Sequence, residues 1–416
     1  AVSAAGVLTA CGGSSSSTAA SSTAGSTAAS AAAGPVTLQW SVWDKESTPY
    51  WQAMADGYMA SHKDVTIEMV DLGSSDYMTV LATQLAGSAD LDIVTIKDIP
   101  GYANLINLDY LKPLNEVLTR DTGDFNGTIE QLTTDDGNFY AVPFRSDFWV
   151  LYYNKDLFEQ AGITEEPKTW DEFKDVCQKL KDAGITPMTM DDAYATCVIG
   201  YHLARLVGED KVKEIVTEGE WDDPAVLQMA QDIEELASNG YYSEMVGSNV
   251  WPAGQNTELA LGTAAMYLNG SWLPNEVKEM AGPDFHWGCF AYPALTDGAN
   301  GIETNNFGAQ VFGINKDTKL AKEAFDLITF LTKGEYDQKL ADETVGIPAD
   351  TTNTEWPAMV ECAKPVIEQS TNRFTWACGV ESNVDMTPVI KENFIKLMAG
   401  SITADEFVST MQDAAK

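Results

Sequence analysis

The sequence predicts an α/β protein of two lobes, each a β-sheet flanked by helices, and three observations lead to this prediction. The chain has 416 residues. About 380 of them remain after a Ser/Ala/Gly/Thr-rich tract at 12–34, which is more than one ordinary core accommodates. Strand-like and helix-like segments alternate from Val36 onward, as in parallel sheets with helical crossovers. The hydrophobic content of 44% and the charged content of 21% are typical of a soluble globular protein.

The first folded segments show this alternation in order. Apolar and polar residues alternate at 36–43, and strand-like apolar runs recur at 65–70 and 91–96. Between these strands, apolar residues at helical spacing indicate helices at 51–59 and 76–86. The order strand, helix, strand, helix, strand predicts a parallel sheet with helical connections.

Turn and cap signals organise the rest of the chain. The Asp-Asp-Gly-Asn sequence at 135–138 is typical of a hairpin turn, and apolar strands are expected at 139–144 and 149–153. Two Thr-x-x-Glu capping boxes, at 169–172 and 403–406, predict helix starts because each side chain satisfies a free backbone N–H. Further helices are expected at 173–184, 224–236, 273–280, 318–332, 386–399 and the chain end.

The net charge excludes several classes of partner. With 62 acidic and 25 basic residues the chain carries a formal charge of -37. Nucleic acids and anionic membranes would be repelled, and anionic ligands are disfavoured unless a local basic pocket overrides the global field. No run of 18 or more apolar residues occurs, so no membrane-spanning helix is expected.

Histidines and cysteines give no sign of a metal or redox centre. The three histidines lie far apart in sequence, without metal-binding spacing, so we expect no cofactor and neither a zinc site nor histidine-based catalysis. The widely spaced Cys177, Cys197, Cys289, Cys362 and Cys378 are not a disulfide framework and are expected to be mostly buried. A Cys362–Cys378 bridge and a calcium ion in an acidic loop are left open.

The N-terminal residues indicate export. The run at 1–10 consists of small and apolar residues, and Leu8-Thr9-Ala10-Cys11 resembles a bacterial lipobox. The resemblance implies that Cys11 carries lipid and anchors the protein to the outer face of the cell membrane, with 12–34 as a flexible spacer. The alternatives are an ordinary cysteine or a plain secretory cleavage site. Because the basic start of an export signal is missing, we expect a truncation at the front.

Four sequence stretches carry a resemblance to a known family. They are Tyr-Ala-Val-Pro-Phe with the later Leu-Tyr-Tyr-Asn-Lys-Asp-Leu-Phe at 140–158, Thr-Trp-Asp-Glu-Phe at 169–173, Ala-Ala-Met-Tyr-Leu-Asn-Gly-Ser-Trp at 264–272 and Gly-Ile-Asn at 313–315. In this order they are similar to the extracellular solute-binding proteins of ABC importers, in the carbohydrate branch that includes maltose-binding protein.

This resemblance implies a two-lobed periplasmic-binding-protein-like fold of class II type, with a ligand cleft at the hinge. One lobe is expected at 35–144 and 304–348, and the other at 145–303 and 349–416. The implied function is capture of a sugar, most simply an oligosaccharide, and its delivery to the transmembrane subunits of an ABC permease. The protein would act outside the cytoplasm as a monomer and break no bond.

Sugars present flat C–H faces and rims of hydroxyl groups, so aromatic rings and carboxylates near strand ends are the expected contacts. The resemblance and these strand ends select the ligand-binding candidates Trp43, Asp44, Asp98, Arg145, Asp147, Tyr194, Trp272 and Trp376, with Trp251 and Asn305 as outside candidates. Each has a structural alternative: core packing for the tryptophans, a helix cap for Asp98, an internal ion pair for Arg145 with Asp147, and a surface loop for Tyr194.

Two other functions compete with sugar binding. The same fold could bind a polyamine, a peptide or a metal, and a polyamine would suit the acidic charge. An exported glycoside hydrolase would need two carboxyl groups either about 5–5.5 Å or about 6.5–9.5 Å apart, one with a raised pKa, but acidic pairs are common in a chain with 62 acids, so their presence is uninformative. Nucleophile-elbow and phosphate-loop motifs do not occur in the sequence.

Overall fold

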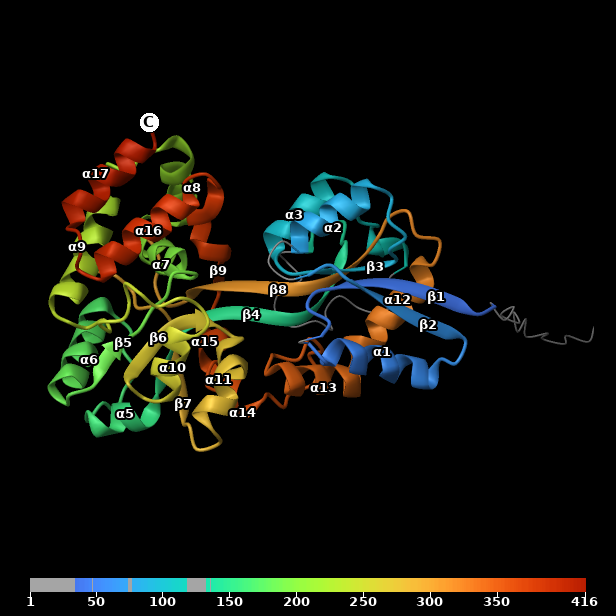
Figure 1. Cartoon of the computed structure of the whole chain (residues 1–416), viewed down its shortest axis with the longest axis horizontal. Helices are drawn as coiled ribbons and strands as arrows, with labels where there is room; N and C mark the ends of the chain where they lie inside the picture. Colours follow the sequence, from blue (N-terminus) through green and yellow to red (C-terminus); the bar gives the residue numbers. More distant parts are fainter. Residues whose placement is uncertain (1–33, 47, 74–76, 118–131, 135) are drawn as a thin grey trace, which may run out of the picture.

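The computed structural model describes residues 34–46, 48–73, 77–117, 132–134 and 136–416. Within them, two lobes are joined by the long strands β4 (Ala141–Asn154) and β8 (Thr304–Ile314) (Figure 1). The strands of this part of the chain form one connected sheet in the order β2-β1-β3-β8-β4-β6-β5, with β7 paired to β4 and β9 to β8. The lobes therefore share a continuous hydrogen-bonded ladder.

The first lobe is built on a parallel sheet, as the sequence predicts. β1 (Val36–Val42) pairs in parallel with β2 (Val65–Asp71) and β3 (Ile93–Ile96). Trp40 of β1 is fully buried, and its indole N–H donates to Thr95 Oγ1 at 2.8 Å, so the ring's polar atom is satisfied inside the core. The helices of this lobe are α1 (Tyr50–Ser61), α2 (Tyr77–Ala86), α3 (Ile99–Asn107), η1 (Leu114–Glu116), α12 (Ala321–Leu331) and α13 (Gly334–Thr344).

The second lobe surrounds the far half of β4. Its remaining strands are β5 (Thr186–Met188), β6 (Ala264–Gly270), β7 (Trp287–Phe290) and β9 (Asn372–Phe374). Its helices are α5 (Lys155–Gln160), α6 (Trp170–Asp182), α7 (Ala195–Val207), α8 (Glu209–Glu218), α9 (Pro224–Ser238), α10 (Gly254–Ala260), α11 (Leu273–Ala281), α14 (Ala358–Glu361), α15 (Lys364–Gln369), η3 (Trp376–Ser382), α16 (Thr387–Met398) and α17 (Ala404–Ala414).

The local signals in the sequence are confirmed where the structure describes them. Both capping boxes form, with Thr169 and Thr403 each accepting from the backbone of the glutamate three residues later. Gly137 adopts φ +77° in a turn whose flanks, Thr133 and Phe139, form an antiparallel bridge. Asp135 of that turn lies outside the described residues.

One expectation about the strands needs correction. The sequence suggests separate strands at 139–144 and 149–153, but β4 is a single strand that crosses from one lobe to the other. Its pairing with β8 shifts register between Pro143 and Arg145, which marks a bulge. The polar residues that interrupt the apolar pattern thus lie in the crossing segment, between two cores.

Two separate hydrophobic cores support the division into lobes. One core includes buried residues from 38–144 and 309–340, and the other from 148–307 and 345–411. These cores favour our proposed lobes, 35–144 with 304–348 and 145–303 with 349–416, to within a few residues. Phe307, Val345 and Ile347 belong to the second core, so the crossings are slightly displaced from those proposed bounds.

The described cysteines, Cys177, Cys197, Cys289, Cys362 and Cys378, are all free thiols. A Cys362–Cys378 bridge is therefore absent, whereas the expectation that most cysteines are buried is confirmed for all but Cys362. Across the described ranges, no helix combines the length and apolar character needed to cross a bilayer. The same residues contain no group of three or more His, Cys, Asp or Glu side chains arranged to hold a metal ion.

Gly200→Ala tests the close packing of α7 against η3. A Cβ atom at Gly200 would lie 2.0 Å from the Ala377 carbonyl oxygen, a backbone atom that cannot swing aside. We expect a loss of about 1–3 kcal/mol in the free energy of unfolding, measured by chemical denaturation. Gly308→Ala is the matched control, since its Cβ would meet no atom within 4 Å. Equal stability of the two variants would contradict this packing.

Candidate functional site

Four aromatic side chains from distant parts of the sequence form one cluster in the second lobe. Trp149 of β4 is 2% exposed and forms the floor. The rings of Tyr194, Trp272 and Trp376 stand on it in T-shaped contacts, with centroid distances of 5.0, 5.3 and 5.4 Å. Trp251, 39% exposed, extends the cluster at 6.2 Å from Tyr194. The structure thus brings together four of the aromatic candidates predicted from the sequence.

Local structure positions each of these rings at the end of an element. Tyr194 immediately precedes α7, Trp272 immediately precedes α11, and Trp376 opens η3. The Trp272 and Trp376 rings are 6.4 Å apart and inclined by only 27°. Because all three rings are partly exposed above a buried floor, they offer apolar faces of the kind that bind the C–H faces of a sugar.

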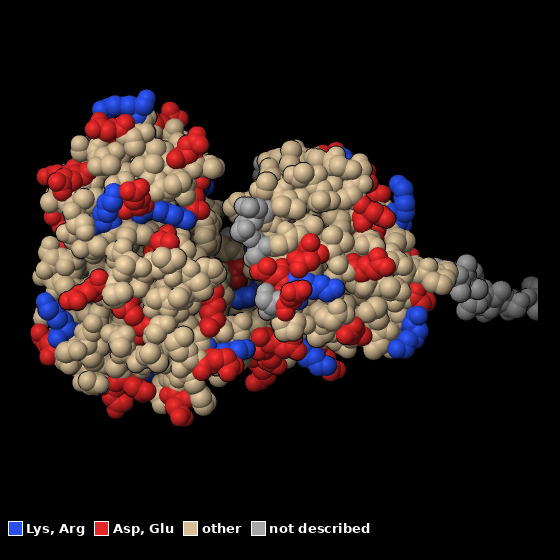
Figure 2. Space-filling model, viewed as in Figure 1, with Lys and Arg blue, Asp and Glu red and all other residues tan. Residues whose placement is uncertain are grey.

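The Glu381 carboxylate contacts this cluster and acts electrostatically on the first lobe. Glu381 accepts hydrogen bonds from the indole N–H of Trp376 at 2.8 Å and from Thr196 Oγ1 at 2.6 Å. Its negative charge also acts on Asp98, at the start of α3 in the first lobe. Figure 2 shows a furrow between the lobes with charged side chains at its base. Glu381, which is bonded to Trp376, is therefore close enough to Asp98 of the first lobe for their charges to interact.

Arg145 and Asp147 lie on the crossing strand at this boundary. Arg145 Nε is 3.4 Å from Asp147 Oδ1, and Ser271 Oγ donates to the same oxygen at 3.3 Å. Burial raises the pKa of Asp147, and the Arg145 charge offsets part of this effect. The pair also acts on Tyr50 of α1, whose pKa is raised to about 12, mainly by burial.

The Arg145 guanidinium has a buried N–H group without a hydrogen-bond acceptor in the described residues. Its side chain is 9% exposed, and Nη2 finds no acceptor among the described residues. A buried donor without an acceptor costs about 1–3 kcal/mol, so this atom is suited to a ligand oxygen. The structure confirms the ion pair of Arg145 with Asp147, and a contact of Arg145 with a ligand hydroxyl stays a prediction.

Asp98 is the N-cap of α3 and has a raised pKa. Its carboxylate accepts from the Gly101 N–H at 2.6 Å and caps α3, as the structural alternative predicted. Burial is the largest cause of its raised pKa, and Glu381 adds to that increase. Capping uses Oδ1, and a contact of Asp98 with a ligand stays a prediction.

Trp43 and Asn305 are placed differently from the other candidates. Trp43 is 8% exposed, packs edge-to-face on Trp51 at 5.0 Å and has Lys97 Nζ 5.1 Å from its ring centroid, so little of its face is open. Asn305 is 1% exposed, and its amide donates to Ile302 O and Ser370 Oγ. Asp44, half-buried with φ +44°, follows Trp43 at the end of β1 and acts electrostatically on Lys97.

Sequence reasoning missed three members of this region. Trp149 was assigned to a buried strand, which is correct, but its place beneath the three exposed rings depends on tertiary contacts. Glu276 follows Trp272 by one helical turn, and Glu381 follows Trp376 by five residues. The proximity of an acid to each tryptophan is a signal that the sequence contains, but 62 acids in the chain obscure it.

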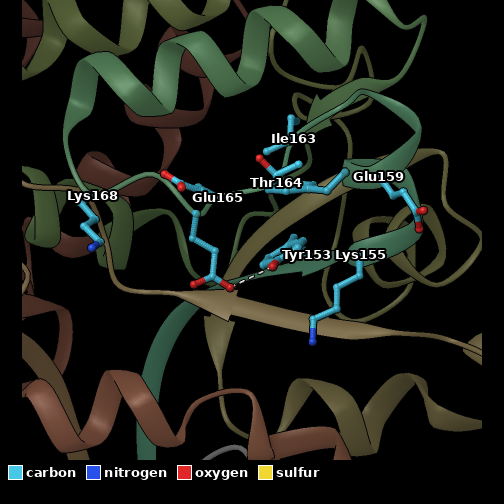
Figure 3. A pocket seen from close by; sticks show the side chains of 9 residues that line it. Tyr153, Lys155, Glu159, Ile163, Thr164, Glu165 and Lys168 are labelled. Atoms are coloured by element: carbon cyan, nitrogen blue, oxygen red, sulfur yellow. Dashed lines mark hydrogen bonds between the residues drawn. The ribbon is translucent and has the colours of Figure 1, made fainter.

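A second hollow lies outside this region. It has a volume of about 570 Å³ and is lined entirely by residues of the second lobe, at the end of β4 and around α5 (Figure 3). Tyr153 donates to Glu166 at 2.8 Å and stacks on Phe158 at 4.0 Å, so its ring is already occupied. With three glutamates and two lysines around it, this hollow lacks the free aromatic faces of the furrow.

Asp98→Asn tests whether the cleft carboxylate is unfavourable without a ligand. Because the folded-state pKa of Asp98 is raised, its stabilising contribution is present below its unfolded pKa and is lost as pH rises. Asn retains the cap without the charge. At pH 7 we expect the unliganded variant to melt about 1–3 °C above the wild type. Below about pH 4 the two proteins should have the same melting temperature. A difference that does not change with pH would contradict this assignment.

The comparisons with known proteins agree with this architecture. The model of the bacterial extracellular solute-binding protein family matches residues 44–338. A lactose-binding protein of Rhizobium radiobacter is 28% identical over 331 residues, covering 75% of this chain and 74% of that protein. An sn-glycerol-3-phosphate-binding periplasmic protein of Pectobacterium atrosepticum is 32% identical over 159 residues, 33% of this chain and 35% of that protein.

A solved structure extends the agreement to nearly the whole fold. The crystal structure of a sugar transporter from Rhizobium etli, in an open conformation, is 24% identical and superposes with a TM-score of 0.67, covering 91% of this chain and 98% of that chain. At this identity the likeness establishes the fold. Because the family match also spans more than half of the chain, this protein belongs to the bacterial extracellular solute-binding proteins.

Proposed function

We propose that this protein captures a carbohydrate, with an oligosaccharide as the preferred class, in the furrow between its lobes. The observation that carries the proposal is the exposed aromatic platform of Tyr194, Trp272 and Trp376 above Trp149. Rings on separate elements can stack on successive sugar faces, while Asp98, Arg145 and Asp147 bond the hydroxyl rims.

Closure of the lobes is the physical basis of capture. Asp98 belongs to the first lobe, and Asp147 and the aromatic platform belong to the second, so a ligand that contacts both sides stabilises the closed arrangement. A ligand shifts this equilibrium only through contacts that are absent from the open state. The protein binds and releases its solute without breaking a bond, in agreement with the family's solute-binding role.

We further propose that the closed protein delivers its solute to the transmembrane subunits of an ABC permease. The folded part would be tethered as a monomer to the outer face of the cell membrane through lipid on Cys11. The lipobox-like sequence before Cys11 supports this proposal, and Cys11 itself lies outside the described residues. Mass spectrometry of Cys11 in membrane-extracted protein would test the anchor.

Solutes other than sugars are the second candidate. One relative binds sn-glycerol-3-phosphate, but the acidic groups of this furrow and the net charge of -37 disfavour a phosphate ligand. A polyamine fits the charge, and a short peptide fits the fold. The aromatic platform favours sugars over both, because it presents several flat apolar faces in one furrow.

A thermal-shift panel of sugars, polyamines and peptides tests the proposed function. Ligand at 100 times its dissociation constant should stabilise the folded state by about 2.7 kcal/mol. Calorimetry on each hit then gives its affinity. We expect a shift with at least one oligosaccharide and no product from it on chromatography. Shifts confined to amines or peptides would contradict the sugar proposal, and turnover would contradict the absence of catalysis.

Trp272→Ala is expected to raise the dissociation constant for the sugar identified in this panel at least about tenfold, because it removes a stacking face. Calorimetry gives the affinity, and the melting temperature reports on folding. Trp356→Ala is the matched control, since Trp356 is a partly buried tryptophan in the same lobe outside the aromatic cluster. Equal affinities of both variants would remove Trp272 from the site.

A further inference from the structure

One carboxylate beside the aromatic cluster, Glu276, is exposed to solvent and forms no ion pair among the described residues. Glu276, in the first turn of α11, accepts a hydrogen bond from Asn256 Nδ2 at 3.1 Å and another from the Trp251 side chain. Within the described part of the chain, no Lys, Arg or His side chain forms an ion pair with it, and Arg145 reaches it only as a weaker, more distant charge.

The neighbouring acids are already satisfied by protein groups. Asp147 pairs with Arg145, and Glu381 pairs with Lys391 at 3.4 Å. Asp191 accepts from the Ala193 and Tyr194 N–H groups and from the Tyr267 hydroxyl. Glu276 shares the lack of an ion pair with Asp191, but Asp191 is fully buried whereas Glu276 is exposed to solvent.

Glu276 lies beside the aromatic cluster. Trp272 lies one helical turn before Glu276, whose N–H donates to the Trp272 carbonyl. Trp251 donates to the carboxylate, and the Tyr194 side chain is close enough for the Glu276 charge to raise the pKa of its hydroxyl group. The rings are connected to one another, with Tyr194 5.8 Å from Trp272 and 6.2 Å from Trp251.

An unpaired carboxylate among aromatic faces is the arrangement that binds an ammonium group. A cation within about 6 Å of a ring centroid is attracted by the ring quadrupole, and the carboxylate adds a charge-assisted hydrogen bond. A hydroxyl group would use the acceptor but gain nothing from the ring quadrupoles or from the net negative charge. The Glu276 side chain is exposed to solvent, so a ligand can reach it.

We propose that the ligand is a saccharide bearing a protonated amine, such as an amino sugar, and that Glu276 with Tyr194, Trp251 and Trp272 binds this ammonium. The inference rests on the proposed function, since the platform supplies the sugar faces. Free polyamines share the ammonium chemistry but lack a face to stack on Trp272 and Trp376.

Matched pairs of sugars test this specificity by calorimetry on the intact protein. The probes are glucosamine against glucose, galactosamine against galactose, and the β-1,4-linked glucosamine disaccharide against cellobiose, with spermidine as the free amine. We expect at least one amine-bearing sugar to bind about tenfold or more tightly than its neutral partner. Its affinity should fall with added NaCl, unlike that of a neutral sugar.

Glu276→Gln should abolish most of this preference, lowering the affinity for the amine-bearing sugar about tenfold while leaving cellobiose binding within about twofold. Gln retains the acceptor for Asn256. Glu279→Gln, an exposed acid on the same helix, is the control and should change neither affinity.

The outcomes separate this inference from the function on which it rests. Equal or tighter binding of the neutral sugars, or a preference unchanged in Glu276→Gln, overturns the amine inference and leaves the sugar-binding function standing. Spermidine binding as tightly as the amine-bearing sugars overturns the saccharide part. Failure of every sugar in this set and in the earlier panel overturns both.

Discussion

The ladder between β4 and β8 is the interaction on which the rest of the structure depends. These two strands pair from Ala141 opposite Gly313 to Phe148 opposite Phe307, and both continue from one core into the other. Because β4 and β8 connect the strands of the two lobes in one sheet, their pairing sets how the lobes are oriented toward each other. Asp147 lies opposite Gly308 in this ladder, at the boundary between the two cores. A bulge near Pro143 adjusts the strand at the same place.

Charges at the crossing are costly for the unliganded protein and useful for binding. Burial raises the pKa of Asp98 and of Asp147, and the Asp98 charge adds to the increase at Asp147 as the Glu381 charge does at Asp98. An apolar crossing would be at least as stable, because a buried ion pair often contributes little net stability. Arg145 alone among these charged groups retains a side-chain donor without an acceptor in the described residues, and in the proposed site a solute oxygen would accept from it when the lobes close.

Local signals predicted the elements well, and the site less completely. Capping boxes at Thr169 and Thr403, the parallel order of the first three strands and the helix after Trp272 follow from short-range patterns, and each is confirmed. Contacts between segments far apart in sequence do not follow from such patterns. Trp43 was expected at the ligand because it ends a strand, yet its ring packs on Trp51. Trp149, in contrast, carries the whole aromatic platform although its strand looked purely structural.

In the proposed site the two lobes would contribute unequally to recognition, and from this asymmetry we infer an order of events. The aromatic platform, Glu276 and Glu381 all belong to the second lobe, whereas Asp98 is the first lobe's clearest contribution. A sugar can therefore stack on the second lobe while the furrow is open, since stacking needs no residue from the first. Closure then brings Asp98 toward Glu381, and this approach of like charges is unfavourable until ligand donors lie between them. The repulsion would keep the empty protein open and reserve the closed form for the loaded one.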